Sequence, residues 1–81
     1  MKVKVQFFAH CREIAGREAM ELELKEGATG RDLWQSLGEK FPKFEGLTII
    51  VALAVNEEYV NSNVVLKDGD QVSLIPPVSG G

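Results

Sequence analysis

The residues with the clearest chemical use in this 81-residue chain are the last two, Gly80 and Gly81. Because glycine has no Cβ and accepts φ of either sign, a Gly-Gly tail can thread a passage too narrow for side chains. Pro76 and Pro77 stand shortly before the tail, and their fixed φ and missing N–H end sheet pairing and favour an extended exit. From Val78 onward the tail can reach about 14 Å, at about 3.5 Å per residue. An ordinary frayed chain end is the alternative interpretation.

The α-carboxylate of Gly81 is the group that such a tail presents to another protein. It is a poor electrophile until a partner activates it, for example as an acyl-adenylate. Attack on that mixed anhydride by a sulfur donor gives a C-terminal thiocarboxylate, and attack by an amine gives an amide. The chain is therefore a sulfur carrier or a protein modifier, unless the tail has no function and the protein is a plain interaction module.

The rest of the sequence indicates no catalytic or metal site. His10 and Cys11 are sequence neighbours, which project in different directions on a helix, and no third group is in evidence to orient the histidine as a base. One histidine and one cysteine cannot form a zinc site, and the twelve acidic residues show no paired-carboxylate spacing. Glycine-rich nucleotide-binding loops are missing as well. We expect a surface histidine, a partly buried structural cysteine, and no cofactor bound by this chain.

Composition predicts one small soluble domain. The chain is 44% hydrophobic and 26% charged, which is ordinary for a globular protein. Its net charge of −3 argues against a nucleic-acid partner. The longest apolar run, Ile49 to Val55, is too short to span a bilayer, the start has no signal-peptide pattern, and a single cysteine fits a reducing cytoplasm. We expect a cytoplasmic domain of residues 1–75 with an extended tail of residues 76–81 and no membrane partner.

Alternating side chains predict the first two strands. Residues 2–8 and residues 19–24 alternate between apolar and polar positions, which is typical of half-exposed strands, and the two should form a hairpin. Phe8 is an exception, because it falls on the polar face of its strand. Between the two strands, residues 10–15 indicate a short helix that ends at Gly16.

The main helix is predicted to begin at Thr29, because Asp32 has the spacing of a capping box. Pro42 should end the helix at or just before the preceding residue. Apolar side chains recur between these limits at helical spacing and should lie against a sheet. They are Leu33, Trp34, Leu37 and Phe41.

Further strands are predicted in the second half of the chain. Residues 49–55 are apolar throughout, which is typical of a central strand buried on both faces. A short segment at residues 59–60 and a last strand at residues 71–75 follow. This order predicts an α+β fold, a mixed sheet of about five strands with one main helix packed on one face. The first and last strands would run parallel at the centre in a β-grasp arrangement.

Phe8 and Ile75 are apolar residues on strand faces that should be exposed to solvent. If the first and last strands are neighbours, these two residues form a docking patch beside the departing tail, and Tyr59 extends it. Scattered apolar surface residues are the alternative, and they are common on soluble proteins.

Several stretches stand out together: Phe7-Phe8-Ala9, Arg12-Glu13, Ala15-Gly16, the turn from Leu66 to Val72, and above all the ending Pro76-Pro77-Val78-Ser79-Gly80-Gly81. They closely resemble the MoaD family of molybdopterin synthase small subunits, within the ThiS/MoaD-like β-grasp sulfur carriers. The similarity covers the whole chain, and the ending is its most specific part. The Asp-Gly-Asp turn alone would be weak, because many β-grasp domains have one.

The resemblance implies a ubiquitin-like β-grasp sulfur carrier that is not catalytic on its own. An E1-like (MoeB-like) enzyme would adenylate the Gly81 carboxylate with ATP and Mg²⁺, and a sulfur donor protein would complete the thiocarboxylate. The tail would then enter a MoaE-like large subunit, where sulfur passes to cyclic pyranopterin monophosphate. In this family the working synthase is a heterotetramer, and its catalytic side chains belong to the large subunit.

The resemblance also implies partner contacts at Phe8, Tyr59 and Ile75, and we assign Arg12 to the same interface. As an exposed charge, Arg12 can instead form a solvated pair with Glu13. Passage of the tail through the partner is assigned to Pro76, Pro77, Val78, Ser79 and Gly80.

Two rival functions share the fold and the Gly-Gly ending. A ThiS-like carrier donates sulfur for the thiazole of thiamin, but it usually lacks the two prolines and is shorter. A ubiquitin-like modifier would instead join Gly81 to lysine side chains. Pro76-Pro77 and Phe7-Phe8 favour the molybdopterin interpretation over ThiS, whereas conjugation as a second role stays open.

Overall fold

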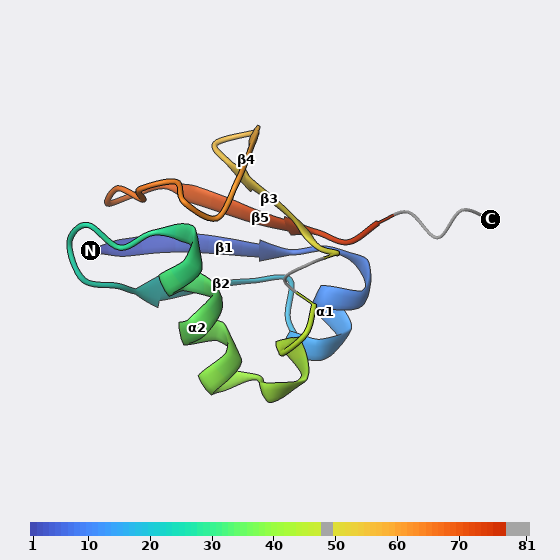
Figure 1. Cartoon of the computed structure of the whole chain (residues 1–81). Coiled ribbons are helices and arrows are strands. Elements are labelled where there is room, and N and C mark those ends of the chain that lie inside the picture. Colours follow the sequence, from blue (N-terminus) through green and yellow to red (C-terminus); the bar gives the residue numbers. More distant parts are fainter. Residues whose placement is uncertain (48–49, 78–81) are drawn as a thin grey trace.

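The two strands at the centre of the protein, β1 (Lys2–Phe7) and β5 (Gln71–Ile75), come from opposite ends of the chain. The structure is a computed structural model that describes residues 1–47 and 50–77. In it β1 and β5 lie side by side and run parallel (Figure 1). The parallel pairing of first and last strands that the sequence predicts is therefore confirmed.

Three more strands complete the part of the sheet that lies within the described residues, in the order β2-β1-β5-β3-β4. β2 (Ala19–Glu23) forms the predicted antiparallel hairpin with β1. β3 (Ala52–Val55) pairs antiparallel with β5 on one side and with the short edge strand β4 (Glu58–Val60) on the other. The mixed sheet and the α+β class agree with the sequence prediction.

Both α-helices, α1 (Ala9–Ala15) and α2 (Gly30–Lys40), lie on the same face of the sheet (Figure 1). A 3₁₀ helix, η1 (Pro42–Phe44), follows α2. Within residues 1–47 and 50–77, no helix is long and apolar enough to cross a membrane. The side chains that the strands bury on this face are Val3, Val5, Phe7, Leu22, Leu53, Val72 and Leu74. Burial of each such side chain stabilises the fold by about 1.5–3 kcal/mol.

The main helix α2 begins at the predicted capping box. Thr29 Oγ1 accepts a hydrogen bond from the Asp32 N–H at 3.4 Å, and Asp32 Oδ2 accepts one from the Thr29 N–H at 2.9 Å. The Asp32 N–H has no acceptor within the helix, so the threonine side chain satisfies it. The hydrogen bond from the Thr29 backbone also lowers the pKa of the Asp32 carboxyl, because it stabilises the charged form.

The apolar side of α2 is buried as its spacing predicts. Leu33 and Leu37 are inaccessible to solvent, and Trp34 is nearly so. The helix ends at Lys40, and the half-buried Phe41 follows it as the C-cap. Trp34 is therefore a core residue, in agreement with its helical spacing.

The predicted strand that starts at Ile49, a residue outside the described ranges, is shorter than its apolar pattern suggests. Sheet pairing begins only at Ala52. The N–H groups of Ile50 and Val51 both donate to the Leu47 carbonyl, at 3.1 and 3.0 Å, so these two residues do not pair in the sheet. Ile50 is consequently 56% exposed, and its prediction as a buried strand residue is wrong.

Phe44 occupies the middle of the core, a role that its sequence pattern does not reveal. It is 1% exposed. Its ring stacks on Phe7 at a centroid distance of 6.0 Å and meets the rings of Trp34 and Phe41 edge-on at 6.1 and 5.9 Å. The short helix η1 thus closes the core below the C-terminal end of α2.

Replacing Thr29 by alanine should lower the free energy of unfolding by about 1 kcal/mol, because the Asp32 N–H loses its side-chain acceptor. Urea unfolding followed by circular dichroism measures this change. Thr29→Ser keeps the hydroxyl and should stay close to wild type. Equal destabilisation by both variants would show that the threonine methyl group, and not the cap, stabilises the helix start.

The stabilising contribution of the Asp32 charge should disappear in acid. The pKa of this carboxyl is lowered from its ordinary value of 3.8, so its contribution is fully present above about pH 4 and is lost as the pH falls through the native pKa. We expect the stability difference between wild type and Asp32→Asn to be constant near neutral pH and to shrink below about pH 4. A difference that is independent of pH in urea unfolding would contradict this assignment.

Candidate functional site

The face of the sheet opposite the helices has no covering element within the described residues (Figure 1). In the middle of this face the outward side chains are polar, with Gln6 of β1 opposite Ser73 of β5. At the C-terminal ends of the same strands they become apolar, because Phe8 follows β1 and Ile75 is the last residue of β5. Phe8 keeps an extended backbone, φ −117° and ψ 147°, so the strand alternation continues through it.

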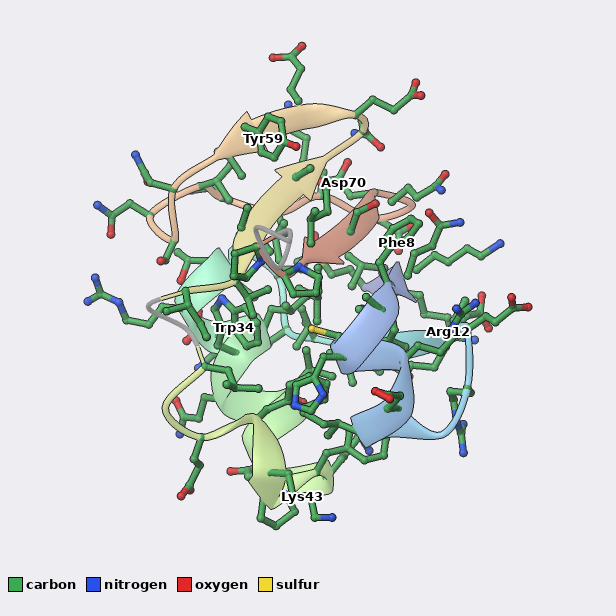
Figure 2. The ribbon with its side chains drawn as sticks, turned by 90° about the vertical axis from the view of Figure 1, so that its right-hand side faces the viewer. Phe8, Arg12, Trp34, Lys43, Tyr59 and Asp70 are labelled. Atoms are coloured by element: carbon green, nitrogen blue, oxygen red, sulfur yellow. The ribbon has the colours of Figure 1, made fainter. Side chains whose placement is uncertain are left out.

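Phe8, Tyr59 and Ile75 line one open hollow of about 490 Å³ on this face. Phe8 is 46% exposed and Tyr59 is 73% exposed, whereas Ile75 is half-buried. Figure 2 shows Phe8 and Tyr59 on the same side of the molecule. The other lining residues are Gln6, Ala54, Asn56, Glu57, Gln71 and Ser73. The structure thus brings the three predicted patch residues together, and partner binding there stays a prediction.

Tyr59 reaches the hollow through the β3–β4 hairpin. Its register partner on β3 is Ala54, which in turn pairs with Ser73 of β5. Ala54 lies on the outer face yet is only 4% exposed. Since alanine is small, its side chain leaves the space above it open, and the bulkier side chains around it form the walls.

The tip of this hairpin is fastened to the sheet by Asn56. Its Oδ1 accepts a hydrogen bond from the Gln71 N–H at 3.0 Å, and its backbone N–H donates to the Gln71 carbonyl at 2.8 Å. Its Nδ2 donates to Asp70 Oδ1 at 3.0 Å. Asn56 and Asp70 were not predicted to have this role. The available signal was an asparagine in a tight turn, a residue type that tolerates positive φ.

The tail leaves the sheet beside the hollow. Pro76 and Pro77 directly follow Ile75, with Pro76 half-buried and Pro77 exposed. Neither proline continues the β5 strand. The remaining tail assignments, Val78, Ser79, Gly80 and Gly81, lie outside the described residues.

Arg12 does not line the hollow. It lies on α1, and its Nη1 donates a hydrogen bond to Glu18 Oε1 at 3.3 Å. Glu13 instead lies beside His10, with 3.6 Å between Glu13 Oε1 and His10 Nδ1. The alternative Arg12–Glu13 pair is therefore not formed, because the side chain of Arg12 turns towards the residues after α1. A partner contact of Arg12 stays a prediction.

Cys11 and His10 lie in different environments, as expected for neighbours on a helix. Cys11 is completely buried, and His10 is exposed. Burial raises the pKa of the Cys11 thiol, so it stays protonated and unreactive near neutral pH. Among the described residues, no group of three histidine, cysteine or acidic side chains is arranged to hold a metal ion.

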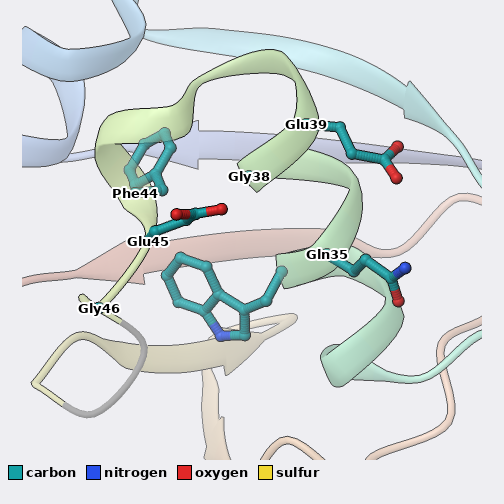
Figure 3. Close-up of a pocket in the computed structure, with 7 residues that line it drawn as sticks. Gln35, Gly38, Glu39, Phe44, Glu45 and Gly46 are labelled. Atoms are coloured by element: carbon teal, nitrogen blue, oxygen red, sulfur yellow. The ribbon is translucent and has the colours of Figure 1, made fainter.

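A second hollow, of about 400 Å³, opens on the helix side of the molecule (Figure 3). Its aromatic residues, Trp34 and Phe44, are core side chains that are 7% and 1% exposed. Glu39 and Glu45 contribute carboxylates, but no nucleophile or histidine accompanies them in this lining. This hollow therefore offers no arrangement for catalysis.

The chain has clear relatives along its whole length. The molybdopterin synthase sulfur carrier subunit of Chlamydomonas reinhardtii is 40% identical, and the match covers all of both chains. The protein of the same name from Arabidopsis thaliana is 36% identical over all of this chain and 84% of its own length.

Solved structures of related proteins also match this chain along nearly its whole length. A protein named as molybdopterin converting factor subunit 1, from Pyrococcus furiosus, matches with a TM-score of 0.87 at 41% identity, over 96% of this chain and 99% of its own. A chain in the complex of subunits 1 and 2 of the molybdopterin-converting factor from Helicobacter pylori matches over all of both chains, with a TM-score of 0.70 and 30% identity. Small archaeal modifier protein 1 of Methanosarcina acetivorans has a TM-score of 0.85 at 28% identity, over 99% and 96% of the two chains.

The neighbours share the ubiquitin-like β-grasp fold, so the fold implied by the sequence is confirmed. A family model described as the ThiS family also matches residues 5–81. The chain therefore belongs to the ThiS family, among the molybdopterin synthase sulfur carrier subunits.

Proposed function

We propose that this protein is the sulfur carrier subunit of a molybdopterin synthase and that its Gly81 carboxylate carries the sulfur. The observation that carries the proposal is the point at which the chain leaves the sheet after β5. The Pro-Pro-Val-Ser-Gly-Gly ending leaves β5 directly after Ile75, and Ile75 lines the apolar hollow. A partner that docks on the hollow thereby receives the tail at the edge of its own contact surface.

The proposed chemistry begins with activation of the C-terminus. An E1-like (MoeB-like) adenylyltransferase joins the Gly81 carboxylate to AMP, using ATP and Mg²⁺ and releasing pyrophosphate. Hydrosulfide supplied by a sulfur donor protein then attacks the carbonyl carbon of the acyl-adenylate and expels AMP, which leaves a thiocarboxylate on Gly81. In the large subunit this sulfur passes to cyclic pyranopterin monophosphate, and the carboxylate is regenerated by water. ATP and Mg²⁺ belong to the activating enzyme, and this chain holds no cofactor of its own.

Catalysis is assigned to the partner. Among the described residues the one cysteine is buried and protonated, and the one histidine is exposed and beside a glutamate, which is not an arrangement for nucleophilic catalysis. The large subunit, of the MoaE type, would supply the active site, in a heterotetramer with two copies of each subunit. The complex of subunits 1 and 2 from Helicobacter pylori supports a partner of this kind. We place the protein in the cytoplasm, a reducing compartment that keeps thiols and thiocarboxylates intact.

Protein modification is the second candidate. It is favoured by the similarity to small archaeal modifier protein 1 of Methanosarcina acetivorans, with which this chain shares fold and length. The same acyl-adenylate would then react with an amine. The two functions differ in the product at Gly81, a thiocarboxylate in one case and an amide in the other.

Protein produced with its activating enzyme and a sulfur donor should gain the mass difference of sulfur for oxygen at Gly81. Intact-mass spectrometry and fragmentation locate the change. Deletion of Gly81 should abolish sulfur transfer yet leave binding of the large subunit largely unchanged, because the docking face is intact. A free carboxylate as the only product under these conditions, or turnover by the deletion variant, would contradict the carrier function.

Phe8→Ala should weaken binding of the large subunit about tenfold, because an exposed aromatic side chain is lost from the docking hollow. Calorimetry with the cognate large subunit measures the affinity, and circular dichroism checks the fold. Val65→Ala is a matched control: Val65 is 57% exposed and does not line the hollow. If Phe8→Ala and Val65→Ala bind the large subunit with equal affinity, the hollow is not part of the interface.

A further inference from the structure

Glu57, at the tip of the β3–β4 hairpin, has a backbone conformation that is unfavourable for glutamate. Asn56 and Glu57 connect the two strands, with φ of 50° and 72°. Two-residue hairpin turns with positive φ at both positions strongly prefer Asn-Gly, because glycine has no Cβ to clash. Asparagine meets this preference at position 56. Glutamate at position 57 does not, so the turn itself gives no reason for a glutamate there.

The conformation of Glu57 is imposed by its neighbours. The three hydrogen bonds of Asn56 to Gln71 and Asp70 fix the residue before it. Glu58 pairs with Val55 in the sheet and fixes the residue after it. Strained residues that are held by their surroundings occur preferentially at functional sites. The backbone of Glu57 is therefore held from both sides, and the presence of a glutamate there needs an explanation outside the hairpin.

Glu57 lines the docking hollow, and its charge is the exception there. The other described lining residues are apolar or neutral: Gln6, Phe8, Ala54, Asn56, Tyr59, Gln71, Ser73 and Ile75. Among the described residues Glu57 has no ion-pair partner within 4.0 Å. A charge beside apolar side chains interacts more strongly once a partner excludes water, because the effective dielectric constant falls. An unpaired carboxylate at this place would then need a positive group opposite it.

We propose that Glu57 determines partner specificity by receiving a lysine or arginine side chain of the large subunit at the rim of the hollow. The inference rests on the proposed function and adds the charge of the contact to it. The complementary charge accelerates association and selects a partner with a basic residue at this point. A partner that presents an acidic or apolar side chain there leaves the Glu57 carboxylate desolvated and unpaired.

The test separates charge from backbone strain. Glu57→Asn removes the charge but places a residue that tolerates positive φ, so the variant should be at least as stable as wild type in urea unfolding. Its affinity for the large subunit should nevertheless fall about two- to fivefold. Glu57→Lys should lower the affinity by about tenfold or more, because two positive charges then meet. Calorimetry with full-length chains at low and high salt measures both effects.

Glu58→Gln is the matched control. Glu58 is the next residue on the same hairpin, is exposed, and does not line the hollow. We expect its affinity to match wild type and the salt dependence of binding to stay unchanged. Loss of salt dependence should be confined to Glu57→Asn, since only that variant removes the charge that faces the partner.

The outcomes distinguish this inference from the proposed function. If Glu57→Asn and Glu57→Lys bind the large subunit as wild type does at every salt concentration, Glu57 makes no such contact, while the carrier function stands. If Glu58→Gln weakens binding as much as Glu57→Asn, the effect is one of net charge and the assignment to Glu57 is wrong. If wild type itself neither binds the large subunit nor gains sulfur, the proposed function fails, and this inference fails with it.

Discussion

The parallel pairing of β1 and β5 is the interaction on which the rest of the structure depends. Because the two strands run in the same direction, their C-terminal ends lie at one edge of the sheet, which places Phe8 and the exit of the tail together. The register puts Val5 opposite Val72, so the inward faces of both strands build one core. A slip of one residue would turn the apolar side chains of β5 to the outer face and bury its polar ones.

The two paired strands are separated by nearly the whole chain. Hydrogen bonds from the turn before β5 hold the start of β1 against the start of β5. Asp68 Oδ1 accepts a hydrogen bond from the Lys2 N–H at 2.7 Å, and the Gly69 N–H donates to the Lys2 carbonyl at 2.8 Å. Gly69 has φ of 86°, which glycine adopts without strain. Asp70 bonds to the β3–β4 hairpin through Asn56, so one turn sets both the centre of the sheet and the wall of the hollow.

The features of the fold that could be predicted are those that depend on residues close together in the sequence. Strand alternation was sufficient to place Phe8 and Ile75 on the outer face, and capping spacing was sufficient to start α2, because both depend on nearby residues. Ile50 was misassigned because apolar character alone does not separate a strand from a turn. The proposed contact of Glu57 could not be predicted, because it is inferred from a backbone angle and from contacts between distant strands. Neither can be read from a single segment.

The burial of Cys11 has a consequence for a protein whose proposed cargo is sulfur. An activated C-terminus reacts with any accessible thiolate, including one on another copy of the same chain. Here the native thiol is enclosed by the core and protonated, so it cannot serve as an acyl acceptor. The domain thus offers no thiolate of its own to an activated C-terminus. If Gly81 carries sulfur as proposed, a reagent selective for accessible thiols should react with the folded chain at its terminus and not at Cys11.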